Sequence, residues 1–70
     1  MEREIFSKRL EELRKRKKVS KNILSELCGL SRDAVRRYEN GEAEPLMSSM
    51  CRIADYFGVS LDWLCGRDSH

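Results

Sequence analysis

The sequence has one proline, four glycines and one histidine, His70, among its 70 residues. No second histidine is present, no nucleophile stands beside a suitable base, and no glycine-rich phosphate loop occurs. These absences predict a protein that is not an enzyme and that needs no cofactor. Three cysteines are present, Cys28, Cys51 and Cys65, but none forms a C-x-x-C pair. We therefore expect buried, reduced thiols and no metal site.

Long apolar runs are also missing, because no stretch approaches the roughly 18 residues of a membrane span. The acidic start of the chain, Met1–Glu4, is unlike a signal peptide. We therefore expect a cytoplasmic protein. The scarcity of glycine and proline leaves no room for a flexible linker, so residues 1–70 are predicted to form one domain, with a core at about residues 5–66.

The net charge of +2 is small, but its distribution is uneven. Residues 1–41 carry 12 lysines and arginines against 7 acidic residues, whereas residues 42–70 carry 2 against 5. This asymmetry fits a polyanionic partner on one side of the domain. It also fits an ordinary solvated surface whose charges are unevenly distributed without a functional reason.

Apolar residues at helical spacing, together with residues that begin and end helices, predict five helices and no strand. Ser20, Ser31 and Ser60 are the expected N-caps, and Gly29, Gly41, Gly58 and Gly66 mark the expected helix ends. The helix dipole offers one explanation of the basic run at the end of the first helix. The predicted helices span about residues 2–17, 21–28, 32–39, 46–57 and 61–65.

Each predicted helix has an apolar face that should line a common core. In the third helix only Ala34, Val35 and Tyr38 qualify, which leaves its other face charged. The expected buried positions elsewhere are Phe6, Leu10 and Leu13, then Ile23, Leu24, Leu27 and Cys28, and finally Met47, Met50, Ile53, Ala54 and Phe57.

From Lys21 to Tyr38 the residues suit two helices that cross through a tight turn, with small Ser25 at the crossing and Gly29 in the turn. Here the chain resembles the phage Cro/repressor (XRE) helix-turn-helix family, from about Phe6 to Gly66. The resemblance implies an all-α, compact five-helix bundle of the phage-repressor type. It is carried by Leu30-Ser31-Arg32, Arg37-Tyr38-Glu39-Asn40-Gly41, Pro45, and Ile53 to Ser60 followed by Leu61-Asp62-Trp63-Leu64.

In that family the third helix enters the major groove of double-stranded DNA. The resemblance therefore implies base contacts by Arg32, Asp33, Arg36 and Arg37. Arginine can bond guanine O6 and N7 together and aspartate can accept from cytosine N4, which predicts a preference for G·C pairs. The alternative is an ordinary solvated face, in which Asp33 interacts with its own helix N-terminus or pairs with Arg36 or Arg37.

The resemblance assigns further positions. Lys21 stands at a phosphate-contact site, and Ser20, Asn22 and Asn40 are candidate neutral phosphate donors that also suit capping or turn roles. Arg14 and Glu39 are implied to form a partly buried ion pair. The chain departs from the family pattern at Ile23, where a capping-box Glu is frequent, and at Glu42 and Glu44, where Lys or Arg often contacts phosphate.

One groove-binding helix rarely gives enough affinity, so a homodimer on a two-fold related site is expected, with no small-molecule ligand. The candidate dimer surface is Leu61, Trp63, Leu64 and Cys65, although Trp63 can equally complete the core. The resemblance also leaves open an alternative to DNA binding, in which the chain is a protein-interaction or antitoxin-like module that retains the fold.

Overall fold

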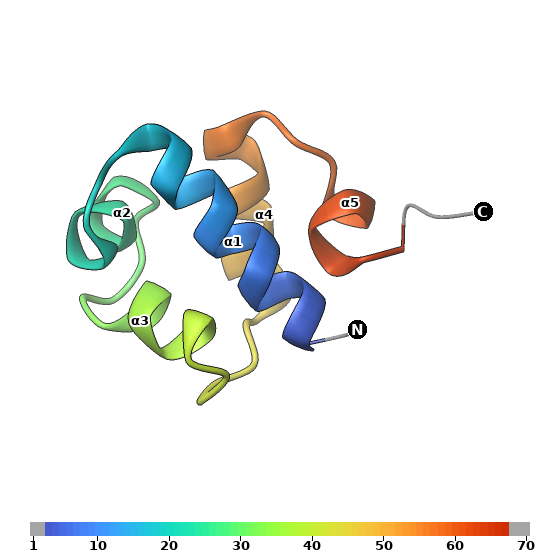
Figure 1. The fold of residues 1–70 in the computed structure, drawn as a ribbon, viewed down its shortest axis with the longest axis horizontal. Helices are drawn as coiled ribbons and strands as arrows, with labels where there is room; N and C mark the ends of the chain where they lie inside the picture. Colours follow the sequence, from blue (N-terminus) through green and yellow to red (C-terminus); the bar gives the residue numbers. More distant parts are fainter. Residues whose placement is uncertain (1–2, 68–70) are drawn as a thin grey trace.

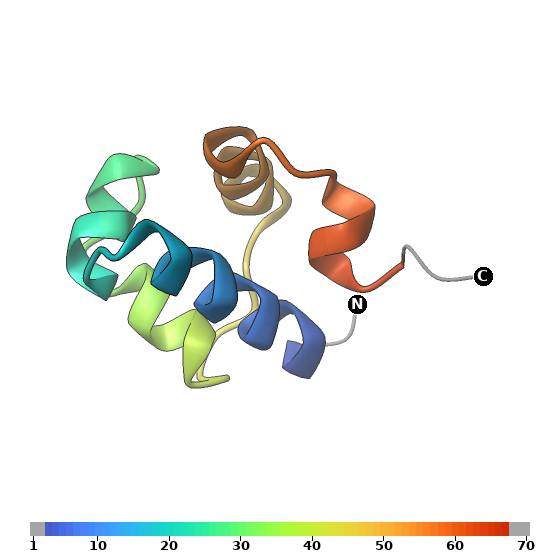
Figure 2. The ribbon, with the colours of Figure 1, turned by 45° about the horizontal axis from the view of Figure 1, so that its top comes forward.

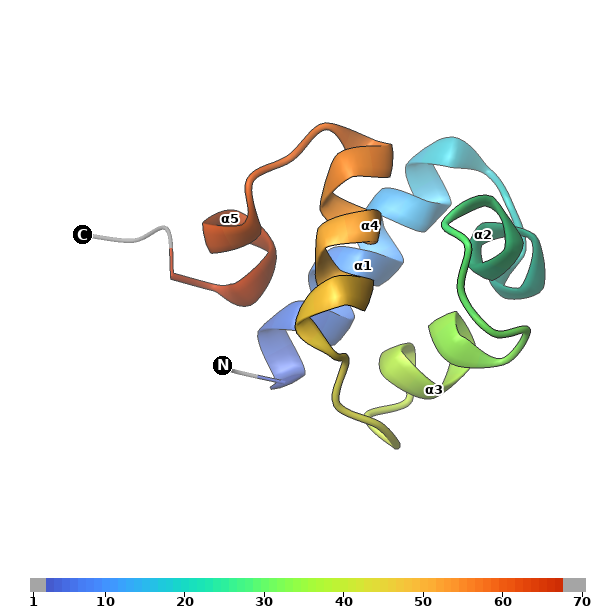
Figure 3. The same ribbon diagram turned by 180° about the vertical axis from the view of Figure 1, so that it is seen from behind.

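The computed structural model describes residues 3–67, which contain five helices and no strand. Figure 1 shows α1 across the middle of the molecule, with α2 and α3 on one side of it and α5 on the other. Seen from behind in Figure 3, α4 lies over α1. The predicted all-α five-helix bundle is confirmed. Its helices are α1 (Arg3–Lys17), α2 (Lys21–Leu27), α3 (Ala34–Glu39), α4 (Met47–Phe57) and α5 (Leu61–Cys65).

The core is built around the apolar stripe of α1, as its spacing predicts. Phe6, Leu10 and Leu13 are all buried, and the ring of Phe6 packs edge-on against Tyr38 of α3, with 5.8 Å between ring centroids. Because α1 touches both α3 and α5, it joins the two ends of the bundle. The other buried apolar residues are Leu24, Cys28, Ala34, Val35, Met50, Ile53, Ala54 and Leu64.

Two of the predicted N-caps are present. The hydroxyl of Ser20 accepts from the backbone N–H of Ile23 at 3.2 Å, and that of Ser60 accepts from Trp63 at 3.0 Å. Each bond satisfies an N–H that a helix start otherwise leaves without a partner. No helix within residues 3–67 is long and apolar enough to span a lipid bilayer.

The start of α3 differs from the prediction. The helix begins at Ala34, not at Arg32, and its N-cap is Asp33, which makes no side-chain capping bond. Ser31 contributes its backbone carbonyl, which accepts from the N–H of Ala34 at 3.0 Å. Residues 31–33 form a turn because the chain must still change direction there before α3 can cross α2.

Three residues that were expected in the core are exposed. Ile23 and Leu27 of α2 are 46% and 51% exposed, and Met47 of α4 is 66% exposed. In α2 the stripe through Leu24 and Cys28 faces inward together with the small Ser25, and Ile23 and Leu27 lie one residue, about 100°, around the helix from that stripe. Met47 is the first residue of α4 and lies outside the packed part of that helix.

Candidate nucleic-acid interface

α2 and α3 are joined at their crossing by the side chain of Ser25. Its fully buried hydroxyl accepts from the N–H of Val35 in α3 at 3.0 Å and donates to the carbonyl of Lys21 at 3.0 Å. The first N–H groups of a helix have no partner within that helix. Ser25 therefore caps α3 from another helix, in place of the side-chain cap that Ser31 was expected to provide.

The turn between the two helices is stabilised from α4. Gly29 adopts a left-handed conformation, with φ of 72°, and its carbonyl accepts from Arg52 Nη1 at 3.1 Å. A Cβ atom at position 29 would lie 2.6 Å from that nitrogen. The sequence indicated the need for glycine here, but it carried no signal for Arg52, which lies 23 residues further along the chain.

The end of α3 is held against α1. Arg14 Nε donates to Glu39 Oε2 at 2.8 Å and Arg14 Nη2 donates to Oε1 at 3.1 Å, while Nη1 donates to the carbonyl of Val19 at 3.1 Å. The side chains of Arg14 and Glu39 are only 13% and 4% exposed. The hydrogen bond with Glu39 raises the pKa of Arg14 above its ordinary value, against the opposing effect of burial. Ser7 adds a hydrogen bond of 2.5 Å to the carbonyl of Tyr38.

The charged face of α3 lies away from the body of the molecule. Ala34, Val35 and Tyr38 are buried on the inner side of the helix. Figures 1 and 2 show α3 at the edge of the bundle, with no other helix beyond it. Of the residues assigned to base contact, Arg32, Asp33 and Arg37 are exposed and Arg36 is partly exposed.

Arg36 lies close to two carboxylates, one on this face and one beyond the end of α3. Its Nη2 lies 3.8 Å from Asp33 Oδ2, and its Nη1 lies 3.7 Å from Glu42 Oε2. Asn40 Nδ2 donates to the same oxygen of Glu42 at 3.1 Å. The contact with Asp33 was one of the alternatives that the sequence left open. The contact with Glu42 was not predicted, because it depends on how the chain turns after α3.

The residues assigned to phosphate contact lie at two places. Ser20, Lys21 and Asn22 stand together at the start of α2, where the side chains of Lys21 and Asn22 have no hydrogen-bond or ion-pair partner among residues 3–67. Asn40 is at the other place, beyond the end of α3, and its amide is already bound to Glu42. A positive helix start with a lysine at its first position suits a phosphate group.

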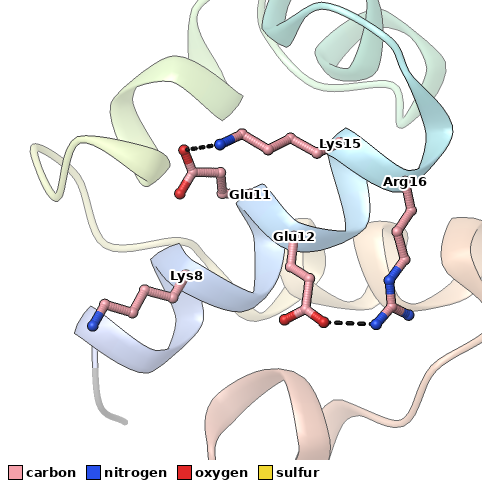
Figure 4. A pocket seen from close by; sticks show the side chains of 5 residues that line it. All are labelled: Lys8, Glu11, Glu12, Lys15 and Arg16. Atoms are coloured by element: carbon pink, nitrogen blue, oxygen red, sulfur yellow. Dashed lines mark hydrogen bonds and ion pairs between the residues drawn. The ribbon is translucent and has the colours of Figure 1, made fainter.

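The basic run at the end of α1 is largely neutralised within the protein. Lys15 pairs with Glu11 at 3.3 Å and Arg16 pairs with Glu12 at 2.7 Å, as Figure 4 shows, and Lys17 lies 5.5 Å from the ring centre of Tyr56. A shallow depression of about 450 Å³ lies along these pairs. Because four of its five lining residues form exposed pairs of opposite charge, it has the features of a solvated helix face.

The expected dimer surface on α5 is smaller than predicted. Leu64 is fully buried in the core, so it has no surface to offer a second subunit, whereas Leu61, Trp63 and Cys65 are half-buried. Arg9 covers part of Trp63, with its guanidinium carbon 4.7 Å from the ring centre and a hydrogen bond to the Trp63 carbonyl. Among residues 3–67 the large apolar side chains that are exposed outside α2 are instead Leu46 and Met47.

The cysteines are free thiols. Cys28 is buried and Cys51 and Cys65 are half-buried, and burial raises the pKa of both Cys28 and Cys65. Within residues 3–67 no three side chains of the histidine, cysteine, aspartate and glutamate types come close enough to hold a metal ion.

Comparisons with known proteins agree with this geometry. The profile of the helix-turn-helix family matches residues 10–64. The chain is 33% identical over 66 residues to the HTH-type transcriptional regulator YqaE of Bacillus subtilis, covering 94% of this chain and 57% of that protein. It is 35% identical over 60 residues to the HTH-type transcriptional regulator AnsR of Bacillus subtilis, covering 86% of this chain and 52% of that protein.

A phage protein is also similar. The transcriptional repressor RstR of the cryptic phage CTXphi, from Vibrio cholerae, is 39% identical over 44 residues, which cover 63% of this chain and 39% of that protein. The chain spans about half the length of the curated relatives it matches. No solved structure matches it. With α2, the turn and α3 all inside the matched region, the chain belongs to the helix-turn-helix family of the phage Cro/repressor (XRE) type.

Proposed function

We propose that this domain binds double-stranded DNA sequence-specifically and acts as a small cytoplasmic transcriptional repressor. The observation that supports this is an outward cationic surface made by Arg36 and Arg37 of α3 and by Arg32 in the turn before it, while both ends of the helix are anchored to the rest of the domain. A rigid, cationic helix of this width fits the major groove of B-DNA. The proposal takes residues 5–66 as the core of one DNA-binding domain that works by binding and not by catalysis.

In the proposed complex Arg32, Arg36 and Arg37 reach base edges or adjacent phosphates. Each good bidentate contact of arginine with guanine contributes about 1–3 kcal/mol of discrimination. Asp33 either accepts a hydrogen bond from cytosine N4 or orients Arg36, whose Nη2 lies 3.8 Å from Asp33 Oδ2. We therefore expect G·C pairs at the positions that α3 reads.

The start of α2 is the proposed phosphate-binding surface. Lys21 provides the charge, and Ser20 and Asn22 provide neutral donors beside it. Asn40 donates one N–H of its amide to Glu42 at 3.1 Å, so the second N–H is the one that it offers to a phosphate. Glu42 and Glu44 repel the DNA backbone, so the affinity for unrelated sequences is expected to be low.

A homodimer is part of the proposal, because two copies of α3 are needed to read two half-sites about 34 Å apart. The half-buried Leu61, Trp63 and Cys65 are retained as candidate contacts, and the exposed Met47 lines a depression together with Cys65, which adds it to this candidate surface. Sedimentation of the protein with Met47→Lys should show a weaker dimer than the parent if this surface is used.

The alternative is a protein-binding module of the antitoxin type. One observation favours it: Ile23 and Leu27 form an exposed apolar pair on α2, beside a depression of about 440 Å³ that Leu30 and Arg32 help to line. A stoichiometric complex with another protein, together with no affinity for duplex DNA, would support this alternative.

The test is selection of bound duplexes from a random pool at stated salt. The parent protein should enrich a two-fold related site rich in G·C pairs, and Arg36→Ala should lose the preference at one base pair of each half-site. Enrichment of no sequence by the parent would overturn the proposed function. A repressor should also lower expression from a promoter that overlaps the selected site.

A further inference from the structure

Glu42 and Asp33 approach Arg36 from opposite ends of α3. The two contacts involve different nitrogens of the guanidinium, Nη1 with Glu42 at 3.7 Å and Nη2 with Asp33 at 3.8 Å. Both are longer than a hydrogen bond, so they orient the group by charge and leave its N–H donors available. Arg36 remains 43% exposed on the outward face of the helix.

The position of Glu42 is set by the way α3 ends. Gly41 is left-handed, with φ of 74°, and its N–H donates to Tyr38 at 3.1 Å. The N–H of Glu42 then donates to the carbonyl of Arg37 at 2.8 Å, which completes the hydrogen-bond pattern of a glycine-terminated helix. Asn40 binds the carboxylate itself at 3.1 Å. The backbone and the side chain of Glu42 are thus both tied to the end of α3.

A carboxylate here has an electrostatic cost. It stands at the negative end of a helix and on the side of the domain that the proposed function turns toward phosphates. If Glu42 only repelled phosphates, the hydrogen bonds that fix its backbone and its carboxylate would have no role in DNA binding. Holding Arg36 in one orientation lowers the conformational entropy that it loses on binding a base.

We propose that Glu42 is a positioning residue for Arg36, so that it weakens binding to all DNA while sharpening the choice of the base pair that Arg36 reads. This inference rests on the proposed function. It predicts that affinity and discrimination move in opposite directions when the charge of Glu42 is removed.

The experiment compares Glu42→Gln with Glu44→Gln. Both remove one negative charge from the same connection, but Glu44 makes no contact with Arg36. Arg36→Ala first identifies the base pair whose preference depends on Arg36. Affinities of the parent and both Gln variants are then measured for the selected duplex, for the same duplex changed at that pair, and for an unrelated duplex.

Both Gln variants should bind the unrelated duplex more tightly than the parent. Only Glu42→Gln should lose discrimination at the Arg36 base pair, by about tenfold, which is within the range of one bidentate contact. In the Arg36→Ala background Glu42→Gln should cause no further loss. Equal discrimination by the two Gln variants would overturn the inference and leave the proposed function intact. An unchanged base preference in Arg36→Ala would have the same consequence. If the parent protein selects no DNA site at all, both the inference and the proposed function are overturned.

A second measurement needs no DNA. In the free protein the order parameter of the Arg36 Nε–Hε group, measured by nitrogen-15 relaxation, should fall in Glu42→Gln and stay at the parent value in Glu44→Gln. A merely structural role of Glu42 would lower the thermal stability without changing that group selectively. An unchanged order parameter in Glu42→Gln would show that the carboxylate does not restrain Arg36.

Discussion

Arg14 and Glu39 join the end of α1 to the end of α3 through two hydrogen bonds of 2.8 and 3.1 Å. Because the pair is almost entirely covered, loss of one partner leaves the other charge buried without compensation. Arg14→Met should therefore lower the free energy of unfolding by about 2–4 kcal/mol in urea melts. The matched control is Arg16→Met, which breaks an exposed pair with Glu12 and should cost less than about 1 kcal/mol. Equal losses in the two variants would mean that Arg14 and Glu39 do not anchor α3.

Two serines near the start of α3 should respond differently to removal of their hydroxyls. Ser25→Ala leaves the N–H of Val35 without its partner in the core, which should cost about 1–2 kcal/mol of unfolding free energy. Ser31→Ala should change it by less than about 0.5 kcal/mol, because Ser31 uses only its backbone carbonyl. Thermal or urea unfolding of both variants checks this. A larger loss of stability in Ser31→Ala would indicate that the Ser31 hydroxyl caps α3, as the sequence predicted.

Gly29 and Gly41 have nearly the same positive φ, 72° and 74°, but different surroundings. An added Cβ at Gly41 meets nothing within 4 Å, whereas at Gly29 it meets Arg52 Nη1. Both alanine variants should lose about 1 kcal/mol of stability from the backbone conformation. Gly29→Ala should lose roughly 1 kcal/mol more, because Arg52 must leave the Gly29 carbonyl. In an Arg52→Ala background that excess should disappear, and its persistence would assign the loss to another cause.

Lys21 has no partner of its own within residues 3–67, so its charge is free to meet a phosphate. Lys21→Ala should weaken binding to related and unrelated duplexes by similar factors, and it should reduce the slope of log affinity against log salt by about one unit. Arg16→Ala is the control, because Arg16 is paired with Glu12 on α1. If both variants keep the parent slope, Lys21 is not a phosphate contact.

Cys28 should make the protein less stable in alkali. Burial raises the pKa of its thiol above the ordinary value of 9.0. As the pH rises through that value, the unfolded state loses a proton that the folded state retains, so the free energy of unfolding falls. The contribution of the Cys28 thiol to the free energy of unfolding is fully present below about pH 9 and decreases above it. Urea midpoints measured from pH 7 to 10 should fall more steeply in the parent than in Cys28→Ala, and parallel curves would contradict the prediction.

Much of the fold could be predicted from residues close together in the sequence. The stripe of Phe6, Leu10 and Leu13 predicted the central helix, and Ser20 and Ser60 predicted two helix starts. These signals work because a helix face and a cap involve residues only three or four positions apart. The family resemblance added the turn and the identity of α3.

The incorrect predictions of burial share one cause, which is not local in the sequence. Ile23, Leu27 and Met47 have the spacing of core residues, yet the rest of the described chain leaves about half or more of each of them exposed. Periodicity shows which residues share a helix face, but it does not show how wide a face the neighbouring helices will bury. The same limit explains Leu64, which the sequence placed at a dimer surface and the structure places in the core.

By itself the sequence determined the helices, the caps Ser20 and Ser60 and the charged outer face of α3, since each depends on local spacing and residue type. Only the tertiary structure decided that Ser25 caps α3 across 10 residues, that Arg52 holds the turn across 23, and that Glu42 faces Arg36. These contacts depend on the angles at which helices cross and on the path of the chain after each helix ends. Such geometry is set by packing of the whole core, so no short stretch of sequence contains it.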